Sequence, residues 1–278
     1  DLSPMPQALC HECDGRKVGT HDIHDITPAA LVKMMVGQSI NEFYSQRTAT
    51  LGATALKVSR LTRLGFFHDI SFQLREGEIL GVVGLCGAGR TELARSLCGL
   101  EPVHHGEVRL FDEVLPPDNY PNAVQKGLVY LSEDRKVDGL FLRLSVTQNL
   151  LAALLPSHSR AGIYFSRDDA AITQRYLDEL GIVAASTETD VGTLSGGNQQ
   201  KVLLGKWLAT QPRVLVLDEP SRGVDVKAKR SIHEAVMALA DQGTAILLVS
   251  SDLPELVGLS DRALVMRNGR LIGEMSKS

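Results

Sequence analysis

The sequence has few aromatic residues, few cysteines and no long apolar run, and each shortage excludes a class of protein. Aromatic residues make up 5% of the 278 residues, and only four are cysteine. So little cysteine argues against a disulfide-rich secreted domain. The longest apolar runs, such as 150–155, are far below the roughly 18 residues that a membrane-spanning helix needs. The first residues lack a basic flank followed by an apolar stretch, so they do not read as a secretory signal.

Excess positive charge is also missing. The chain holds 29 Lys and Arg against 33 Asp and Glu, a formal net charge of −4, so a nucleic-acid partner is not expected. Cys10 and Cys13 form a C-x-x-C pair, but no second ligand pair follows at zinc spacing. Ordinary thiols are therefore favoured over a metal site. With 44% hydrophobic residues, the chain can bury one large core or two modest ones.

One short pattern occurs twice. DGRKVG at 14–19 and NGRLIG at 268–273 both predict a tight turn that leads into a strand. Their offset is 268 − 14 = 254 residues, about the length of one domain. Because the chain also lacks an initiator methionine, we expect a piece of a longer tandem protein. Residues 1–54 are then the tail of a preceding domain plus a linker, with a helix from Thr27 to Gly37, and 55–278 form the next copy.

Strand and helix signals alternate from about residue 55. The apolar runs 79–84, 214–218 and 245–251 have the character of strands buried in a parallel sheet. Between them lies a helical section, with a capping box at Ser145 and a glycine stop at Gly181. The pattern predicts an α/β fold with a helical insertion.

A glycine-rich loop follows the first of these strands. Gly84 to Thr91 matches the phosphate-loop pattern G-x-x-x-x-G-K-[ST], except that Arg90 replaces the lysine. Such a loop turns backbone N–H groups toward phosphate at a helix N-terminus, and Thr91 can ligate Mg²⁺. A plain glycine-rich turn without a ligand is the alternative. A dinucleotide fingerprint fails because Glu92 stands where its last glycine belongs. The candidate ATP-binding residues are Gly84, Leu85, Cys86, Gly87, Ala88, Gly89, Arg90 and Thr91.

Two adjacent carboxylates end the strand VLVLD. Asp218 and Glu219 lie where α/β ligand sites form, and paired buried carboxylates are costly without a cation or a chemical role. We expect Asp218 to contact Mg²⁺ directly or through a coordinated water, and Glu219 to polarise an attacking water as the catalytic residue. A solvated strand end is the alternative.

A third motif, LSGGN, opens a helix. Ser195 can cap a helix whose first residues are glycines, which leaves backbone amides open to a phosphate. The candidate signature residues are Leu194, Ser195, Gly196, Gly197 and Asn198. Alone they would indicate only a loop-to-helix junction.

The three motifs together resemble the ATP-binding cassette (ABC) transporter ATPases, from about residue 55 to the end. GAGRTEL, YLSEDRK, TLSGGNQQK and DEPSRGVDV resemble the second half of tandem ATPases that drive bacterial uptake of monosaccharides such as ribose, xylose and galactose. A related importer of a signalling furanone carries similar motifs. The arginine in the phosphate loop is usual in that second copy.

The resemblance implies an α/β P-loop NTPase fold, a three-layer sandwich with a mainly parallel sheet, an antiparallel β subdomain and a helical subdomain at about 138–200. It implies ATP and Mg²⁺ as cofactors. The implied partners are membrane permease subunits, a first nucleotide-binding domain of the same chain and, indirectly, a periplasmic solute-binding protein. The implied location is peripheral, on the cytoplasmic face of the inner membrane. The permease contact would lie between the helical section and the Glu133 loop.

Four ATP-contacting positions, with Glu133 and Ser251 among the candidate ATP-binding residues, depart from the usual cassette pattern. Glu133 replaces a glutamine that contacts magnesium and the permease, Ser251 replaces a switch histidine, and Thr62 replaces the aromatic residue that stacks on adenine. Arg90 is the fourth departure, whereas Glu219 and the signature are intact. In cassette dimers, each ATP lies between one copy's phosphate loop and the other copy's signature.

These departures predict that this half binds MgATP with weak turnover and donates its signature, in trans, to ATP held by the first copy. An interaction module that docks the permease without nucleotide stays open, as does import of a sugar-derived signalling molecule. A cassette ATPase of repair or translation is disfavoured by the motif variants. Nothing in the sequence specifies the sugar.

Overall fold

The computed structural model describes residues 8–13, 16–22, 51–85, 87–160, 163–164 and 168–276. Contacts between residues divide the chain into two compact units, residues 1–46 and 47–278. Cys86 and the helix expected from Thr27 to Gly37 lie outside the described residues.

The first unit contains an antiparallel hairpin of β1 (Ala8–Cys13) and β2 (Arg16–Asp22). Cys13 pairs with Arg16 and Glu12 with Lys17, and the register then shifts before His11. The strand predicted after the first D-G turn is confirmed as β2.

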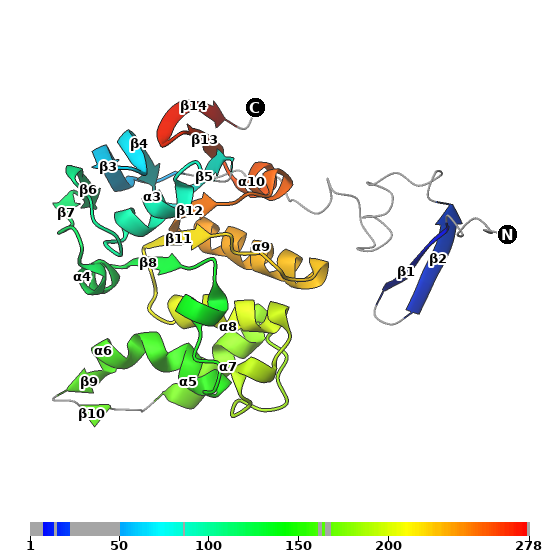
Figure 1. Ribbon diagram of the computed structural model, residues 1–278. Helices are drawn as coiled ribbons and strands as arrows, with labels where there is room; N and C mark the ends of the chain where they lie inside the picture. The colour runs from blue at the N-terminus through cyan, green and yellow to red at the C-terminus, as the bar shows by residue number, and fades with distance from the viewer. Residues whose placement is uncertain are drawn as a thin grey trace. The chain divides into compact units, whose positions relative to one another are not determined.

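A six-stranded sheet forms the centre of the second unit, in the order β14-β13-β5-β12-β11-β8 (Figure 1). All neighbours are parallel except β13 and β14. The three predicted apolar runs are its central strands, and they are buried because helices and a second sheet cover them. The strands are β5 (Ile79–Gly84), β8 (Leu128–Leu131), β11 (Val214–Asp218), β12 (Ala245–Val249), β13 (Arg262–Arg267) and β14 (Arg270–Ser276).

A four-stranded antiparallel sheet, β4-β3-β6-β7, supplies the other side of the core. Along β4 buried and exposed side chains alternate, so one face is covered and the other faces solvent. The core joins Phe67 and Leu74 of this sheet to Leu93 of α3 and Leu247 of β12. The elements are β3 (Thr54–Arg63), β4 (Phe67–Arg75), β6 (His105–Leu110), β7 (Glu113–Val114) and α3 (Arg90–Leu97).

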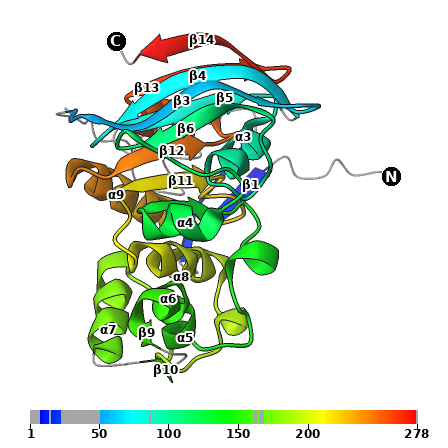
Figure 2. The same ribbon diagram turned by 90° about the vertical axis from the view of Figure 1, so that its left-hand side faces the viewer.

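The predicted helical insertion is confirmed, and it lies beyond the β8 edge of the six-stranded sheet (Figures 1 and 2). Ser145 makes the expected capping box, and Gly181 ends α7 in the left-handed conformation. The elements here are a π-helix (Arg135–Gly139), α5 (Val146–Leu151), a 3-10 turn (Ala152–Leu154), α6 (Leu155–His158), β9 (Ser159–Arg160), β10 (Ile163–Tyr164), α7 (Asp169–Leu180), a 3-10 turn (Val191–Thr193) and α8 (Gly196–Leu208).

Three further helices pack around the sheet: α4 (Tyr120–Gln125), α9 (Val226–Asp241) and α10 (Leu253–Leu259). Asp225 caps α9 by accepting a hydrogen bond from the Ala228 amide. Within the described part of the chain, no helix is long and apolar enough to cross a bilayer. The sheets and insertion match the α/β architecture that the sequence predicts.

A two-residue turn joins β13 to β14. Asn268 and Gly269 both have positive φ, 50° and 72°, as a type I′ turn requires. Met266 pairs with Leu271 and Val265 with Gly273, so the register shifts by one residue there. The same shift, at the same distance from the turn, occurs in the β1–β2 hairpin. The repeated sequence pattern therefore corresponds to two hairpins with one register.

Candidate functional site

The phosphate loop runs from the end of β5 to the start of α3. Gly89 precedes the helix with φ 92°, and a Cβ there would lie 2.8 Å from the Phe66 carbonyl oxygen, so only glycine fits. Leu93 N donates to the Gly89 carbonyl, which closes the first helical turn. The strand, glycine turn and helix predicted for Gly84, Leu85, Gly87, Ala88, Gly89, Arg90 and Thr91 are confirmed.

Arg90, at the position of the expected lysine, points toward two strand ends. Its Nη1 donates to the Ser250 carbonyl oxygen over 2.6 Å, directly after β12. Its Nη2 lies 3.7 Å from Glu219 Oε1, after β11. The side chain is only 11% exposed. One guanidinium therefore connects the phosphate loop to both strands that carry the other site residues.

Asp218 and Thr91 lie side by side, as the metal prediction requires. Thr91 Oγ1 donates to Asp218 Oδ1 over 3.3 Å, and the Tyr130 hydroxyl donates to Asp218 Oδ2 over 2.8 Å. Burial raises the pKa of Asp218, although the hydrogen bonds from Tyr130 and Thr91 act in the opposite direction. A hydroxyl and a carboxylate are the hard oxygen donors that Mg²⁺ accepts when phosphate oxygens complete its shell, so these residues fit the ion.

No larger protein cage for a metal is present among the described residues. Within those ranges, no group of three or more His, Cys, Asp or Glu side chains is placed to hold a metal ion. A hydroxyl, one carboxylate and substrate phosphates are the donor set that suits Mg²⁺ in phosphoryl-transfer sites.

Glu219 lies at the centre of the site with an unusual backbone. Its φ is 49°, outside the regions that most residues with a side chain adopt, and its amide donates to the Val249 carbonyl over 2.8 Å. Ser251 Oγ donates to Glu219 Oε2 over 3.1 Å, while Arg90 approaches the other oxygen. Contacts on both oxygens therefore fix the direction of the carboxylate. The positive φ of Glu219 is a strained backbone conformation, and strain of this kind, held by the surrounding structure, is frequent at functional sites.

Glu133 and Thr62 have partners within the domain. Glu133 forms an ion pair with Arg222, in the loop that follows Glu219. Thr62 Oγ1 accepts a hydrogen bond from the Asp69 amide over 3.0 Å. Among the described residues, no hydrogen bond or ion pair joins either side chain to Asp218 or Thr91. Glu133 and Thr62 therefore lie outside the group of residues that contact one another, which is Arg90, Thr91, Asp218, Glu219 and Ser251.

The signature residues form the start of α8. Ser195 caps this helix as predicted, because its Oγ accepts hydrogen bonds from the Asn198 amide and side-chain Nδ2. Asn198 Oδ1 accepts from the Val183 amide over 2.9 Å, which fixes the cap against the end of α7. Leu194 and Gly196 are partly exposed and Gly197 is buried. Among the described residues, no hydrogen bond or ion pair joins the signature to Arg90 or Glu219.

Two residues that the motif reasoning did not select connect these parts. Tyr130 holds Asp218, and Arg135 donates through Nε to Gln199 of α8 and through Nη1 to the Arg222 carbonyl. Both belong to the YLSEDRK segment at 130–136. That segment identifies the family resemblance, but its side-chain partners lie 64 to 88 residues away in sequence.

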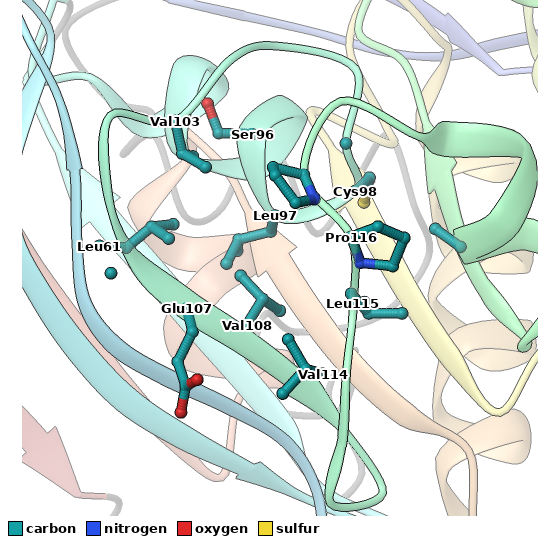
Figure 3. Close-up of a pocket in the computed structure, with 14 residues that line it drawn as sticks. Leu61, Ser96, Leu97, Cys98, Val103, Glu107, Val108, Val114, Leu115 and Pro116 are labelled. Carbon is teal, nitrogen blue, oxygen red and sulfur yellow. The ribbon is translucent and has the colours of Figure 1, made fainter.

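A pocket of about 100 Å³ lies away from these residues (Figure 3). Leu97 and Cys98, at the end of α3 opposite Arg90, line it together with Leu61, Val108 and Pro116. Burial raises the pKa of Cys98 far above its ordinary value, so its thiol is unreactive in the native state. None of the described residues of the phosphate loop lines this pocket.

Comparison with known proteins supports the family. The model of the ABC transporter family matches residues 67–222. The ribose import ATP-binding protein RbsA 2 of Rhizobium meliloti (strain 1021) is 46% identical over 265 residues, which cover 95% of this chain and 52% of that protein. A putative ribose/galactose/methyl galactoside import ATP-binding protein of Burkholderia cenocepacia (strain HI2424) is 42% identical over 94% of this chain and 50% of its own length.

Solved structures support the fold independently. A nucleotide-free ATP-binding cassette from an ABC transporter superposes with a TM-score of 0.68 at 20% identity, covering 81% of this chain and 92% of the other. The ADP conformation of another cassette gives 0.69 at 21% identity, covering 81% and 91%. The chain spans about half the length of the curated relatives it matches. The matched family, the shared fold and the assembled phosphate loop agree: the chain belongs to the ABC transporter family, as one of its ATP-binding cassette domains.

Proposed function

We propose that this chain is an ATP-binding half of an importer for a monosaccharide or a similar small molecule. One observation carries the proposal: Arg90, Thr91, Asp218 and Glu219, from the phosphate loop and the end of β11, converge in one place. The curated relatives are named as import ATP-binding proteins for ribose or galactose. Those names support a sugar as the cargo, and which sugar is left open.

The residues divide the chemistry of ATP hydrolysis among them. The backbone amides of the phosphate loop and of α3 donate hydrogen bonds to phosphate oxygens. Arg90 adds a permanent positive charge. Thr91 and Asp218 hold Mg²⁺, which neutralises charge on the phosphates when bound. Glu219 orients and polarises the attacking water. Ser251, which stands at the position of the usual histidine, holds Glu219 through a hydrogen bond. Because the histidine is missing, we infer weak ATP turnover at this site.

The signature is proposed to act on ATP held by another cassette. Its glycines and its Ser195 cap are intact. Among the described residues, no hydrogen bond or ion pair joins them to the phosphate loop of this chain. In the family arrangement, each ATP lies between one phosphate loop and the opposite signature. Leu194, Ser195, Gly196, Gly197 and Asn198 would then complete an efficient site on the first nucleotide-binding domain.

The two hairpins support a tandem protein. β1–β2 and β13–β14 share every strand pairing at an offset of 254 residues, from Cys13↔Arg16 against Arg267↔Arg270 to the same register shift. In the second unit, this hairpin forms the edge of the six-stranded sheet. We infer that β1 and β2 are the corresponding edge of a preceding cassette, in agreement with the half-length match to the curated relatives.

A membrane permease is the proposed direct partner, with a periplasmic solute-binding protein acting through it. Three apolar side chains are exposed close together in sequence, between the Glu133 loop and α5: Val137 at 78%, Phe141 at 54% and Leu144 at 39%. Exposed apolar groups of this kind mark interaction sites. We propose that they contact the permease, which places the chain peripherally on the cytoplasmic face of the membrane.

An interaction module that does not use nucleotide is the second candidate. It is favoured by the contacts of Arg90, whose guanidinium engages Ser250 and Glu219 of its own domain. In that case the domain would donate its signature and dock the permease only.

Calorimetric titration of the chain with MgATP separates the two candidates. We expect saturable binding that Arg90→Ala weakens by about tenfold or more, because charge-assisted hydrogen bonds to phosphate are lost. Arg175→Ala, at an exposed arginine of α7, is the matched control and leaves the affinity unchanged. Absence of any binding by the parent chain would select the interaction module.

A further inference from the structure

A buried carboxylate lies behind the site and none of the motifs includes it. Glu255 belongs to α10, is 1% exposed, and its Oε1 lies 2.6 Å from His233 Nε2 of α9, which is equally buried. Its Oε2 accepts a hydrogen bond from Ser250 Oγ over 2.5 Å. A carboxylate is rarely buried so completely unless its partners compensate for the lost hydration.

The partners of Glu255 keep it ionised. Burial alone would raise the pKa of Glu255, but the hydrogen bond and charge of His233, together with hydrogen bonds from Ser221 and Ser250, outweigh burial and lower that pKa to about 2. One carboxylate therefore joins α9, α10, the end of β12 and the loop after β11. A buried network that joins four elements through one carboxylate holds its members in one arrangement.

Two of these partners are next to the proposed catalytic groups. The Ser250 carbonyl accepts the hydrogen bond of Arg90 Nη1, and the next residue, Ser251, donates to Glu219. Ser221 comes two residues after Glu219 in the loop that ends β11. The position of the Ser250 backbone thus decides both where Arg90 is anchored and how Glu219 is held.

We propose that Glu255 is a positioning residue of the nucleotide site, which fixes Ser250 and Ser221 and thereby the guanidinium of Arg90. The inference rests on the proposed function, because it concerns how Arg90 meets a nucleotide. Arg90 contributes through a fork of several N–H donors. One nitrogen can stay on the Ser250 carbonyl while the others face phosphate oxygens. A lysine carries its three N–H donors on one nitrogen, so it could not spread its contacts over as wide a fork.

The consequence is an energetic coupling between two residues that do not touch. Loss of the Glu255 charge loosens Ser250, so Arg90 is less well ordered before nucleotide binds and affinity falls. When Arg90 is absent, the same change at Glu255 has no phosphate-binding guanidinium left to disturb. A purely structural role of Glu255 would instead weaken binding equally with or without Arg90.

A double-mutant cycle measured by MgATP calorimetry tests this coupling. Glu255→Gln preserves the shape of the side chain, and it should weaken MgATP binding about fivefold in the parent background. In the Arg90→Ala background, it should change the affinity by less than about twofold. Glu234→Gln, which removes an exposed carboxylate next to His233 on α9, is the matched control and should do neither.

A second variant covers the case in which Glu255→Gln does not fold. Ser250→Ala removes the hydroxyl that donates to Glu255 and accepts from the Asp252 amide, and it leaves the carbonyl that Arg90 uses. It should therefore reproduce the fivefold loss and the same dependence on Arg90. Equal losses in both backgrounds would overturn the positioning role while leaving nucleotide binding intact. A parent chain that binds no MgATP would instead overturn the proposed function, and the positioning role with it.

Discussion

The phosphate-loop side and the signature side of this cassette are built from the same kind of element, a loop that opens a helix, yet they differ in what their side chains do. On the phosphate-loop side, Arg90 and Ser251 bind groups of their own domain at Ser250 and Glu219. On the signature side, Ser195 is exposed and caps its helix, whereas Gly196 is partly exposed and Gly197 is buried. The phosphate-loop side chains thus engage one another, whereas the signature presents Ser195 to solvent.

The four positions that differ from the usual cassette pattern share one property. Each departure from the usual cassette pattern has acquired an intramolecular partner: Arg90 with Ser250, Glu133 with Arg222, Ser251 with Glu219 and Thr62 with Asp69. The altered residues therefore bind groups of their own domain around the site. Under the proposed function, the unaltered signature takes its partner from another cassette.

The largest expected effect is at the signature. In a full-length tandem protein with its permease, Ser195→Arg should reduce transport by about 100-fold, because a bulky cation covers amides that bind the phosphate of the opposite ATP. The chain's own MgATP affinity should not change. Gln174→Arg, on an exposed position of α7, is the control. Transport that survives Ser195→Arg but is lost with Arg90→Ala would reverse the assignment of the two sites.

A smaller effect is expected at the phosphate loop. Arg90→Lys should raise ATP turnover about tenfold, since a compact ammonium fits between phosphate oxygens in the transition state better than a planar fork. Nucleotide affinity should change by less than about threefold. Steady-state phosphate release at saturating MgATP measures turnover, and calorimetry measures affinity. An unchanged or lower rate would show that arginine is not the cause of slow turnover.

The smallest expected effect is on stability, at the helix that carries the signature. Lys206 of α8 is buried and its Nζ donates to the Gly139 carbonyl over 2.7 Å. Burial lowers the pKa of Lys206 to about 8. In the unfolded chain that pKa is ordinary, roughly 10.4, so between these values the unfolded state binds more protons. Stability contributed by this group therefore rises with pH across that window and is constant below it.

Removal of the ammonium should abolish this rise. Relative to Lys206→Met, the parent chain should gain about 1 to 3 kcal/mol of unfolding free energy between pH 8 and 10. Denaturant titrations at several pH values measure the difference. Lys227→Met, at an exposed lysine of α9, is the control and should run parallel to the parent. A parallel curve for Lys206→Met would mean that the lysine keeps its ordinary proton affinity in the folded protein.

Local signals in the sequence predicted the elements of the second unit well. The apolar runs became β5, β11 and β12, Ser145 and Ser195 became helix caps, and Asn268-Gly269 became a hairpin turn. Each of these depends on residues a few positions apart, so short-range hydrogen bonding and backbone preference are enough to specify it. The three motifs likewise predicted the fold through their resemblance to the cassette family.

Only the tertiary structure decided which side chains meet. Arg90 reaches Ser250 across 160 residues, Tyr130 reaches Asp218 across 88, and His233 meets Glu255 inside the protein. Such contacts depend on strand register and on how helices settle against the sheet. A shift of one residue would turn a side chain to the opposite face of the sheet. The sequence by itself determined that a phosphate loop, paired carboxylates and a signature exist, whereas packing determined that Arg90 is anchored on Ser250 and that Glu255 lies behind it.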